Sequence, residues 1–228
     1  MTQFSRMIPL VGEDGLQKLK NARVAVFGVG GVGGYVAEAL VRSGVGALDL
    51  VDGDTVSLTN LNRQIVALHS TLGQYKTEVM AARALDINPE LKVKTYNLFY
   101  SEDCTTFDFS SYDYVVDAVD SVPAKIALIA ASKRANVPVI SSMGAGNKLD
   151  ATAFEVADIS KTSVCPLARV MRKKLKEQGI EKVKVVYSKE EPKQGGLAGE
   201  KPCPASVAFV PSVVGLIIAG EVIKDLLK

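Results

Sequence analysis

The segment RVAVFGVGGVGG, residues 23–34, most constrains how this chain can fold. Apolar and β-branched residues fill its first half, and Gly28, Gly30 and Gly33 form a G-x-G-x-x-G pattern before the helical run GGYVAEALVRSGV. In a strand–turn–helix unit, the first glycine permits a tight turn, the second lets the backbone approach a phosphate, and the third lets helix and strand pack closely. Free N–H groups at the helix start favour an anion. The segment therefore predicts a nucleotide-binding unit.

Strand and helix patterns alternate through residues 22–146. The apolar runs ALDLVDGD and YDYVVDAVD indicate buried strands, and GQYKTEVMAARALDINPE and PAKIALIAASKRANV indicate helices. This alternation predicts an α/β fold with a doubly wound, Rossmann-like, mostly parallel sheet and helices on both faces. A length of 228 residues with 47% hydrophobic content suits one domain, residues 1–228, in which 22–146 form the nucleotide-binding core.

The pattern changes in residues 147–205, which predict a basic helix-and-strand extension. CPLARVMRKKLKEQG is typical of an amphipathic helix with Leu167, Val170, Met171 and Leu175 inward. EKVKVVYSKE alternates as a strand, and EPKQGGLAGEKPCPA is interpreted as a mobile loop.

Residues 206–228 predict an apolar helix broken near Gly215, packed inside the protein or at a dimer interface. No apolar run reaches the roughly 18 residues that a membrane span needs. The start MTQFSRMIPLVGEDG has no signal-peptide core. We therefore expect a cytoplasmic protein without a membrane partner.

Charge is unevenly distributed along the chain. Residues 161–201 contain 11 basic and 5 acidic residues, whereas the remainder contains 16 basic and 20 acidic residues. Such a basic segment suggests an anionic partner such as nucleic acid, although a solvated lysine-rich face gives the same pattern.

The cysteines and the histidine exclude several kinds of site. Cys104, Cys165 and Cys203 are odd in number and form no C-x-x-C pair, which argues against a disulfide framework and a structural zinc site. His69 is the sole histidine, so a metal site with several histidines is excluded, and we interpret it as structural rather than catalytic.

Residues beyond the glycine turn separate two kinds of nucleotide. Asp52 ends the second strand, where a carboxylate can bind ribose hydroxyls, and this suits a nicotinamide dinucleotide and ATP equally. A nicotinamide cofactor needs no further Arg63 and Lys76, but a triphosphate does, because charge develops on its phosphates during transfer. Asp120 follows a later strand and can hold Mg²⁺. Together they favour ATP.

The motifs GVGGVG, DGDTVSLTNLNRQ, GQYK and DAVD occur here in order, and with them residues 6–146 resemble the ATP-binding core of the ThiF-type superfamily. That superfamily includes the thiamine and molybdopterin adenylyltransferases and the ubiquitin-activating enzymes. The resemblance implies a homodimer that activates a carboxylate with ATP and Mg²⁺. The residues implied to bind ATP are Gly28, Gly30, Gly31, Gly33, Asp52, Asp54, Asn60, Arg63, Gln64, Lys76 and Asp120, with Arg6 entering the partner's site.

Within that set, Arg63, Lys76 and Asp120 are implied to act catalytically, and Asp120 to hold Mg²⁺ through ATP. A bound monovalent cation, Na⁺ or K⁺, is also in keeping with the resemblance.

The second half narrows the resemblance. The segments ISKTSVCPLARVMRKKLKEQGI and VKVVYSKEEP, together with the core, resemble the tRNA threonylcarbamoyladenosine dehydratases over nearly the whole chain. This implies ATP-dependent cyclisation of a threonyl carboxylate on a modified adenosine of tRNA. The residues then expected to hold tRNA phosphates are Arg169, Arg172, Lys173, Lys174 and Lys176.

Alternatives stay open at this stage. The same ATP chemistry could activate the C-terminus of a small sulfur-carrier protein, although the two C-x-x-C zinc pairs usual in such enzymes are missing. An NAD-dependent oxidoreductase and a non-catalytic tRNA-binding module are further candidates. Cys203 could form a thioester with the activated carboxylate. A sulfur-relay partner and the splitting of ATP to AMP or ADP are left undecided.

Overall fold

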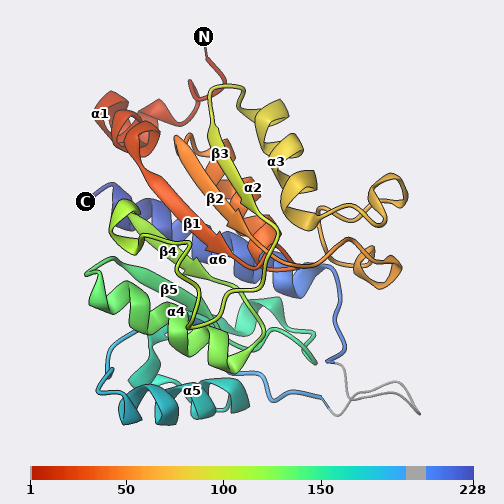
Figure 1. Cartoon of the computed structure of the whole chain (residues 1–228), viewed down its shortest axis with the longest axis vertical. Helices are drawn as coiled ribbons and strands as arrows, with labels where there is room; N and C mark the ends of the chain where they lie inside the picture. The colour runs from red at the N-terminus through yellow and green to blue at the C-terminus, as the bar shows by residue number, and fades with distance from the viewer. Residues whose placement is uncertain (1, 194–203) are drawn as a thin grey trace.

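The computed structural model describes residues 2–193 and 204–228, and it confirms the predicted α/β fold (Figure 1). The strands, in chain order, are β1 (Arg23–Phe27), β2 (Ala47–Val51), β3 (Lys92–Tyr96), β4 (Tyr114–Asp117), β5 (Val139–Ser142), β6 (Phe154–Asp158) and β7 (Lys184–Ser188). The helices are α1 (Ile8–Asn21), α2 (Gly33–Arg42), α3 (Lys76–Ile87), α4 (Val122–Arg134), α5 (Pro166–Glu177) and α6 (Phe209–Leu226).

All these strands form one sheet in the order β3-β2-β1-β4-β5-β7-β6. Neighbouring strands are parallel, except that β6 is antiparallel to β7. The basic extension therefore continues the core sheet, because β7 pairs with β5. Strand order reverses between β1 and β4, and doubly wound sheets bind ligands at the carboxyl ends of strands beside such a reversal.

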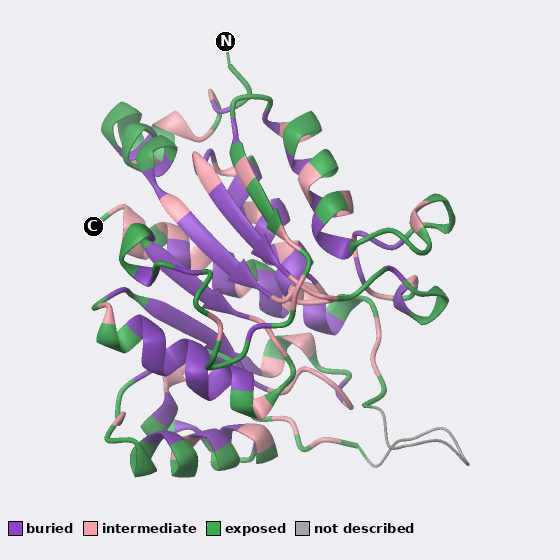
Figure 2. Cartoon of the chain, in the orientation of Figure 1, coloured by how far each residue is buried: buried purple, intermediate pink, exposed green. Residues whose placement is uncertain are grey.

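Helices cover both faces of the sheet, and Figure 2 shows the buried strands between them. Helices α2 and α6 pack together on one face, with Leu40 and Ile218 fully buried there. Helices α4 and α5 lie on the other face and bury Leu128 and Met171. No helix within the described ranges is long and apolar enough to cross a membrane.

The predicted break of the C-terminal helix near Gly215 is wrong. Helix α6 is continuous from Phe209 to Leu226. Gly215 instead marks the closest approach of α6 to α2, since a Cβ there would lie 2.4 Å from the backbone oxygen of Val32 and 2.8 Å from the Cβ of Tyr35. The glycine is required by packing, not by a turn, and the helix is buried as expected.

Helix α5 buries a slightly different stripe from the predicted one. Met171 and Leu175 are fully buried as expected, but Val170 is 42% exposed and Ala168 is buried in its place. Residues at positions 168, 171 and 175 share one helical face, and the smaller alanine lets α5 lie close to α4.

An aromatic loop, residues 97–113, covers the sheet between β3 and β4, with only the short 3₁₀-helix η3 (Phe109–Ser111) in it. The ring of Phe27 in β1 lies 5.2 Å, centroid to centroid, from the rings of Tyr100 and Phe107. Edge-to-face aromatic packing of this kind replaces a covering helix on that part of the sheet.

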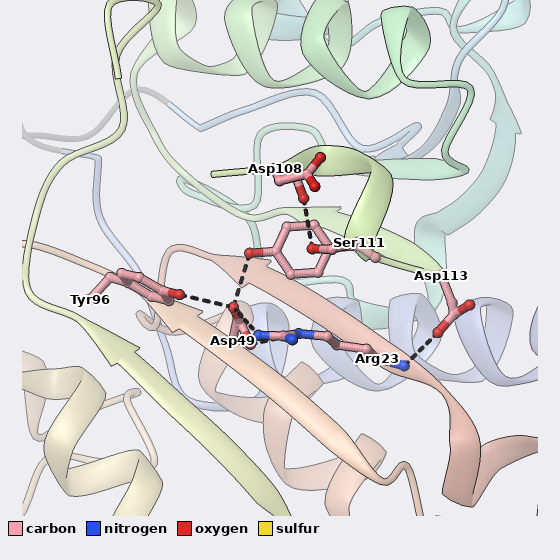
Figure 3. A network of polar contacts seen from close by, with 7 residues as sticks. Arg23, Asp49, Tyr96, Asp108, Ser111 and Asp113 are labelled. Atoms are coloured by element: carbon pink, nitrogen blue, oxygen red, sulfur yellow. Dashed lines mark hydrogen bonds and ion pairs between the residues drawn. The ribbon is translucent and has the colours of Figure 1, made fainter. Parts of the chain in front are cut away.

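A buried polar network ties this loop to the sheet (Figure 3). Asp49 of β2 is 1% exposed and accepts hydrogen bonds from Arg23, Tyr96 and Tyr112. Arg23 also donates its backbone N–H to Asp113. Burial, followed by the charge of Asp49, raises the pKa of Tyr112, so the phenol stays a donor. The buried carboxylate is therefore paired and fully hydrogen-bonded.

Candidate nucleotide-binding site

A cleft of about 380 Å³ opens at the carboxyl ends of β1, β2 and β4. This is where the strand order predicts a ligand. The predicted ATP residues that line it are Gly28, Gly30, Gly31, Asp52, Asp54, Asn60, Arg63, Gln64, Lys76 and Asp120. Residues up to 92 positions apart in the chain, from Gly28 to Asp120, thus meet at one site.

The glycine turn has the three roles that its spacing predicts. Gly28 has φ +88°, and a Cβ there would lie 2.5 Å from the carbonyl oxygen of Ala118. A Cβ on Gly33 would lie 1.7 Å from the carbonyl oxygen of Gly28, so helix α2 could not pack there. Gly30 faces open space, its nearest neighbour being Nε2 of Gln64 at 3.8 Å. The backbone at Gly30 is therefore free to approach a phosphate.

Asp52 is held in place by two backbone groups. One carboxylate oxygen accepts from the N–H of Val29 at 2.7 Å, and the other accepts from the N–H of Asp54 at 2.8 Å. Each oxygen keeps a further lone pair for a ligand hydroxyl. This fixed carboxylate beside the glycine turn matches the predicted ribose contact.

Two cations face the cleft from different elements. Lys76, at the start of α3, is buried, and its Nζ lies 2.7 Å from a carboxylate oxygen of Asp54. Arg63 uses Nη1 to bind the carbonyl oxygen of Thr59 and Oδ1 of Asn62, at 2.9 and 2.8 Å. The rest of its planar fork remains for a phosphate.

Gln64 and Asn60 bring amide groups to the same wall. Asn60 closes the 3₁₀-helix η1 (Leu58–Asn60), because its Oδ1 accepts from the N–H of Ser57 at 3.1 Å. Gln64 is buried, and its Oε1 has no hydrogen-bond partner within the residues described. A buried, unpartnered amide oxygen indicates a donor supplied by a ligand or by water.

Asp120 lies in the loop after β4, because that strand ends at Asp117 instead of continuing to Asp120 as predicted. Its side chain is exposed within the cleft. One open carboxylate fits Mg²⁺, which takes one or two carboxylates together with substrate phosphates. Across the described residues, no group of three or more His, Cys, Asp or Glu side chains could hold a metal by itself.

A buried ion pair behind Asp120 was not anticipated from sequence. Asp117 and Lys125 are both fully buried, and Nζ of Lys125 lies 3.1 Å from Asp117 and 3.0 Å from the carbonyl oxygen of Val119. Ser141 also donates to Asp117. These bonds fix the backbone that leads into Asp120. The signal was present as an acid and a lysine eight residues apart in otherwise apolar segments.

Two further walls were also missed. Phe99 lines the cleft, is 70% exposed, and touches the position of a Cβ on Gly53 at 2.7 Å, so an aromatic face lies beside the ribose carboxylate. Residues 204–206 close the other side. Their backbone is held by Asn62, which donates to Ser206 at 2.9 Å, and by Asn147, which accepts from Ala205 at 2.7 Å.

Some predicted residues lie elsewhere. Arg6 is exposed just before α1 and does not line the cleft, and a contact made in a partner subunit stays a prediction. His69 is exposed and also lies outside the cleft. Cys165 is buried at the start of α5, and Cys104 is half-buried. Cys203 falls outside the described residues.

The predicted tRNA residues lie on α5. The exposed members are Arg169, Lys173, Lys174 and Lys176. Arg172 is half-buried, and its Nη1 donates to the carbonyl oxygen and Oγ1 of Thr162 at 2.9 and 2.6 Å. The first turn of α5 adjoins the cleft, since Cys165 packs 3.7 Å from the Cβ position of Gly144, next to the lining residues Ala145 and Gly146.

The chain matches the ThiF family over residues 4–228. It is 50% identical to a Bacillus subtilis tRNA threonylcarbamoyladenosine dehydratase, covering 99% of this chain and 95% of the relative. Crystal structures of the Escherichia coli tRNA N6-threonylcarbamoyladenosine dehydratase with AMP and with ATP superpose with TM-scores of 0.90 and 0.88, at 36% identity and over 99% of this chain and 94% and 93% of theirs. A Salmonella typhimurium molybdopterin-synthase adenylyltransferase is 36% identical over 68% of this chain and 63% of its own length.

Proposed function

Because the chain belongs to the ThiF family, we propose that it uses ATP to dehydrate threonylcarbamoyladenosine in tRNA, closing the threonyl carboxylate into a ring. A B. subtilis dehydratase of this name is 50% identical to it over almost its whole length. The observation that carries the proposal is the cleft itself, where the glycine turn, the ribose carboxylate Asp52 and the cations Arg63 and Lys76 converge beside the basic helix α5.

The chemistry requires activation of the carboxylate. A carboxylate reacts poorly with nucleophiles because oxide would have to leave. Transfer of AMP, or of phosphate, from ATP to the carboxylate oxygen makes a mixed anhydride and releases pyrophosphate, or ADP. A nucleophile on the same modified base then attacks the carbonyl carbon and expels AMP, or phosphate, so the nucleoside loses one water overall. The second step is intramolecular and therefore fast.

The described residues divide this work between them. Asp52 holds the ribose and the turn at Gly30 holds the phosphate chain, while the exposed ring of Phe99 offers a surface for the adenine. Arg63 and Lys76 stabilise the negative charge that develops on the phosphates. Asp120 would hold Mg²⁺, which neutralises phosphate charge.

The reaction is tested by incubating the protein with ATP, Mg²⁺ and tRNA carrying threonylcarbamoyladenosine. Mass spectrometry of the digested nucleosides should show the loss of one water. Lys76→Ala should slow the reaction by about 10²-fold or more, because it removes a charge that stabilises the transition state. The exposed Lys92→Ala, on β3, is the matched control. A folded wild-type protein that leaves the nucleoside mass unchanged would refute the proposal.

A second candidate is activation of a small sulfur-carrier protein, favoured by the similarity to a molybdopterin-synthase adenylyltransferase. The chain has no C-x-x-C pair for the zinc site expected of such enzymes. Pyrophosphate exchange that depends on a Gly-Gly-ended carrier would support it. Tight binding of NADH without binding of ATP would instead support an oxidoreductase, and an unchanged Lys76→Ala variant would support a non-catalytic tRNA-binding module.

The assembly belongs to the same proposal. We infer a cytoplasmic homodimer in which Arg6 of one subunit reaches the ATP of the other, with tRNA as the macromolecular substrate. A sulfur-relay partner and a monovalent cation remain predictions from the resemblance alone.

A further inference from the structure

A second cavity, of about 260 Å³, lies at the far end of α5 from the nucleotide cleft. Its polar lining comes from Ser160 in the 3₁₀-helix η5 (Ile159–Lys161), from Arg172 and Lys176 on α5, and from Glu181 and Lys182 just before β7. None of these residues lines the nucleotide cleft. The cavity is therefore a separate site.

The cavity has an excess of positive charge. Three cations and one carboxylate line it, and neither Lys176 nor Lys182 makes an ion pair with any residue that the structure describes. Asp158 lies nearby, but one of its oxygens already accepts from the N–H and Oγ of Ser160. Thr162 anchors Nη1 of Arg172, which leaves the other guanidinium nitrogens for a ligand. A preoriented guanidinium flanked by lysines is suited to phosphate oxygens.

Basic side chains link this cavity to the nucleotide cleft. Arg169, Lys173 and Lys176 follow at intervals of four and three residues, so they line one side of α5. The helix has 12 residues and is therefore about 18 Å long. Its first turn adjoins the cleft and its last turn borders the cavity. A polyanion lying along α5 would reach both sites.

The position of the cavity favours a polyanion over a small free anion. It lies beside the C-terminal end of α5, where the helix dipole repels negative charge. Side-chain cations must overcome that repulsion, and an isolated phosphate gains little from them in water. A phosphate belonging to a strand that is already bound along α5 arrives at a high effective concentration.

We propose that this cavity binds a backbone phosphate of the substrate tRNA, several nucleotides from the adenosine in the nucleotide cleft. The proposal rests on the proposed function, because it takes the RNA to be the substrate. It also orients the RNA, whose backbone runs along α5 from the cleft at the first turn to the cavity at the last. Arg172 then acts as a positioned phosphate ligand, and Lys182, which lies outside the helix, is a contact that the amphipathic pattern did not predict.

The test replaces two exposed lysines of the cavity in the full chain. We expect Lys176→Ala/Lys182→Ala to bind threonylcarbamoyladenosine-containing tRNA with a salt dependence, log Kd against log salt, shallower by about 1.5 to 2. KM for tRNA should rise while kcat and the affinity for ATP stay as in the wild type. Lys92→Ala/Lys94→Ala, two exposed lysines on the opposite edge strand β3, is the matched control and should keep the wild-type slope.

The outcomes separate the cavity from the reaction. If the wild type dehydrates tRNA and the cavity variant keeps the wild-type salt slope and KM, the cavity assignment is wrong and the proposed function survives. If the wild type neither binds nor dehydrates tRNA, both are overturned. If inorganic phosphate at equal concentration displaces tRNA from the wild type but not from the cavity variant, the cavity is a small-anion site and the RNA assignment fails. Unchanged thermal midpoints for both double variants exclude misfolding as the cause.

Discussion

Single residues behind the nucleotide cleft decide how firmly its walls are held. The turn at Gly28 and Gly33 admits no side chain because backbone oxygens of Ala118 and Gly28 occupy the space. Asp52 is oriented by two N–H donors before any ligand arrives. The fully buried pair of Asp117 and Lys125 does the same for the loop that ends in Asp120. The site is therefore preorganised, and its ligand contacts cost little rearrangement.

At this scale we predict that Lys125→Met destabilises the protein by about 3–5 kcal/mol, because it leaves the buried carboxylate of Asp117 without its partner. Urea unfolding measures the loss. Combining it with Asp117→Asn should recover part of the stability, since no buried charge then remains. Lys133→Met, at an exposed position late in the same helix, is the control. Equal stability of Lys125→Met and the control would contradict the interpretation.

Helix α6 sets the position of helix α2, and through it the glycine turn. The two helices meet at Gly215, where the helix of the C-terminal segment lies against the backbone of Val32, one residue before α2 begins. The N-terminal turn of α2 carries the N–H groups expected to face phosphate. The contact therefore connects the last element of the chain to the first functional motif.

Because of this contact, Gly215→Ala should destabilise the protein by about 1–3 kcal/mol through overpacking, although alanine is the better helix former. Gly220→Ala lies in the same helix with nothing within 4 Å of its Cβ position, and it should stabilise by up to about 1 kcal/mol. Thermal and urea unfolding of the two variants give the comparison. Two alanine variants that shift stability in the same direction would show that propensity, not the contact, dominates.

Across the whole molecule, a polar network joins the C-terminal helix to the sheet. Lys184 of β7 bonds Glu221 and Asp225 of α6, and Tyr114 of β4 donates to Asp225 at 2.9 Å. Burial alone would raise the pKa of Asp225, but the bonds from Lys184, Lys228 and Tyr114 outweigh it and lower this pKa to about 2. Part of the positive charge of the basic extension is thus used internally and not presented to a partner.

This network predicts a dependence of stability on pH. The pKa of Asp225 is about 2 in the folded protein against an ordinary value of 3.8, so its contribution is complete above about pH 4 and disappears as the pH falls towards 2. Asp225→Asn should flatten this part of the stability curve, measured by urea midpoints across that range. The exposed Asp86→Asn should leave the curve unchanged. A wild-type loss of stability equal to that of Asp225→Asn between pH 4 and 2 would argue against the network.

Sequence alone determined the local elements and the nucleotide-binding motif. Strand, turn and helix between residues 23 and 54 follow from hydrophobic period and glycine spacing, which act within a few residues. The order of strands followed from the alternation of patterns. All but two of the predicted ATP residues line one cleft, because the carboxyl ends of parallel strands meet at one edge. The two exceptions are Gly33, which packs behind the turn, and Arg6.

Only the tertiary structure decided where distant segments meet. Local propensity made Gly215 a helix break, but packing against Val32 made it a close contact. The same holds for Val170, which lies outside the buried stripe because α4 accepts the smaller Ala168, and for Phe99 and residues 204–206, whose place in the cleft wall has no local signal. Steric fit and the pairing of buried charges depend on neighbours far apart in the chain, and residue spacing carries no record of them.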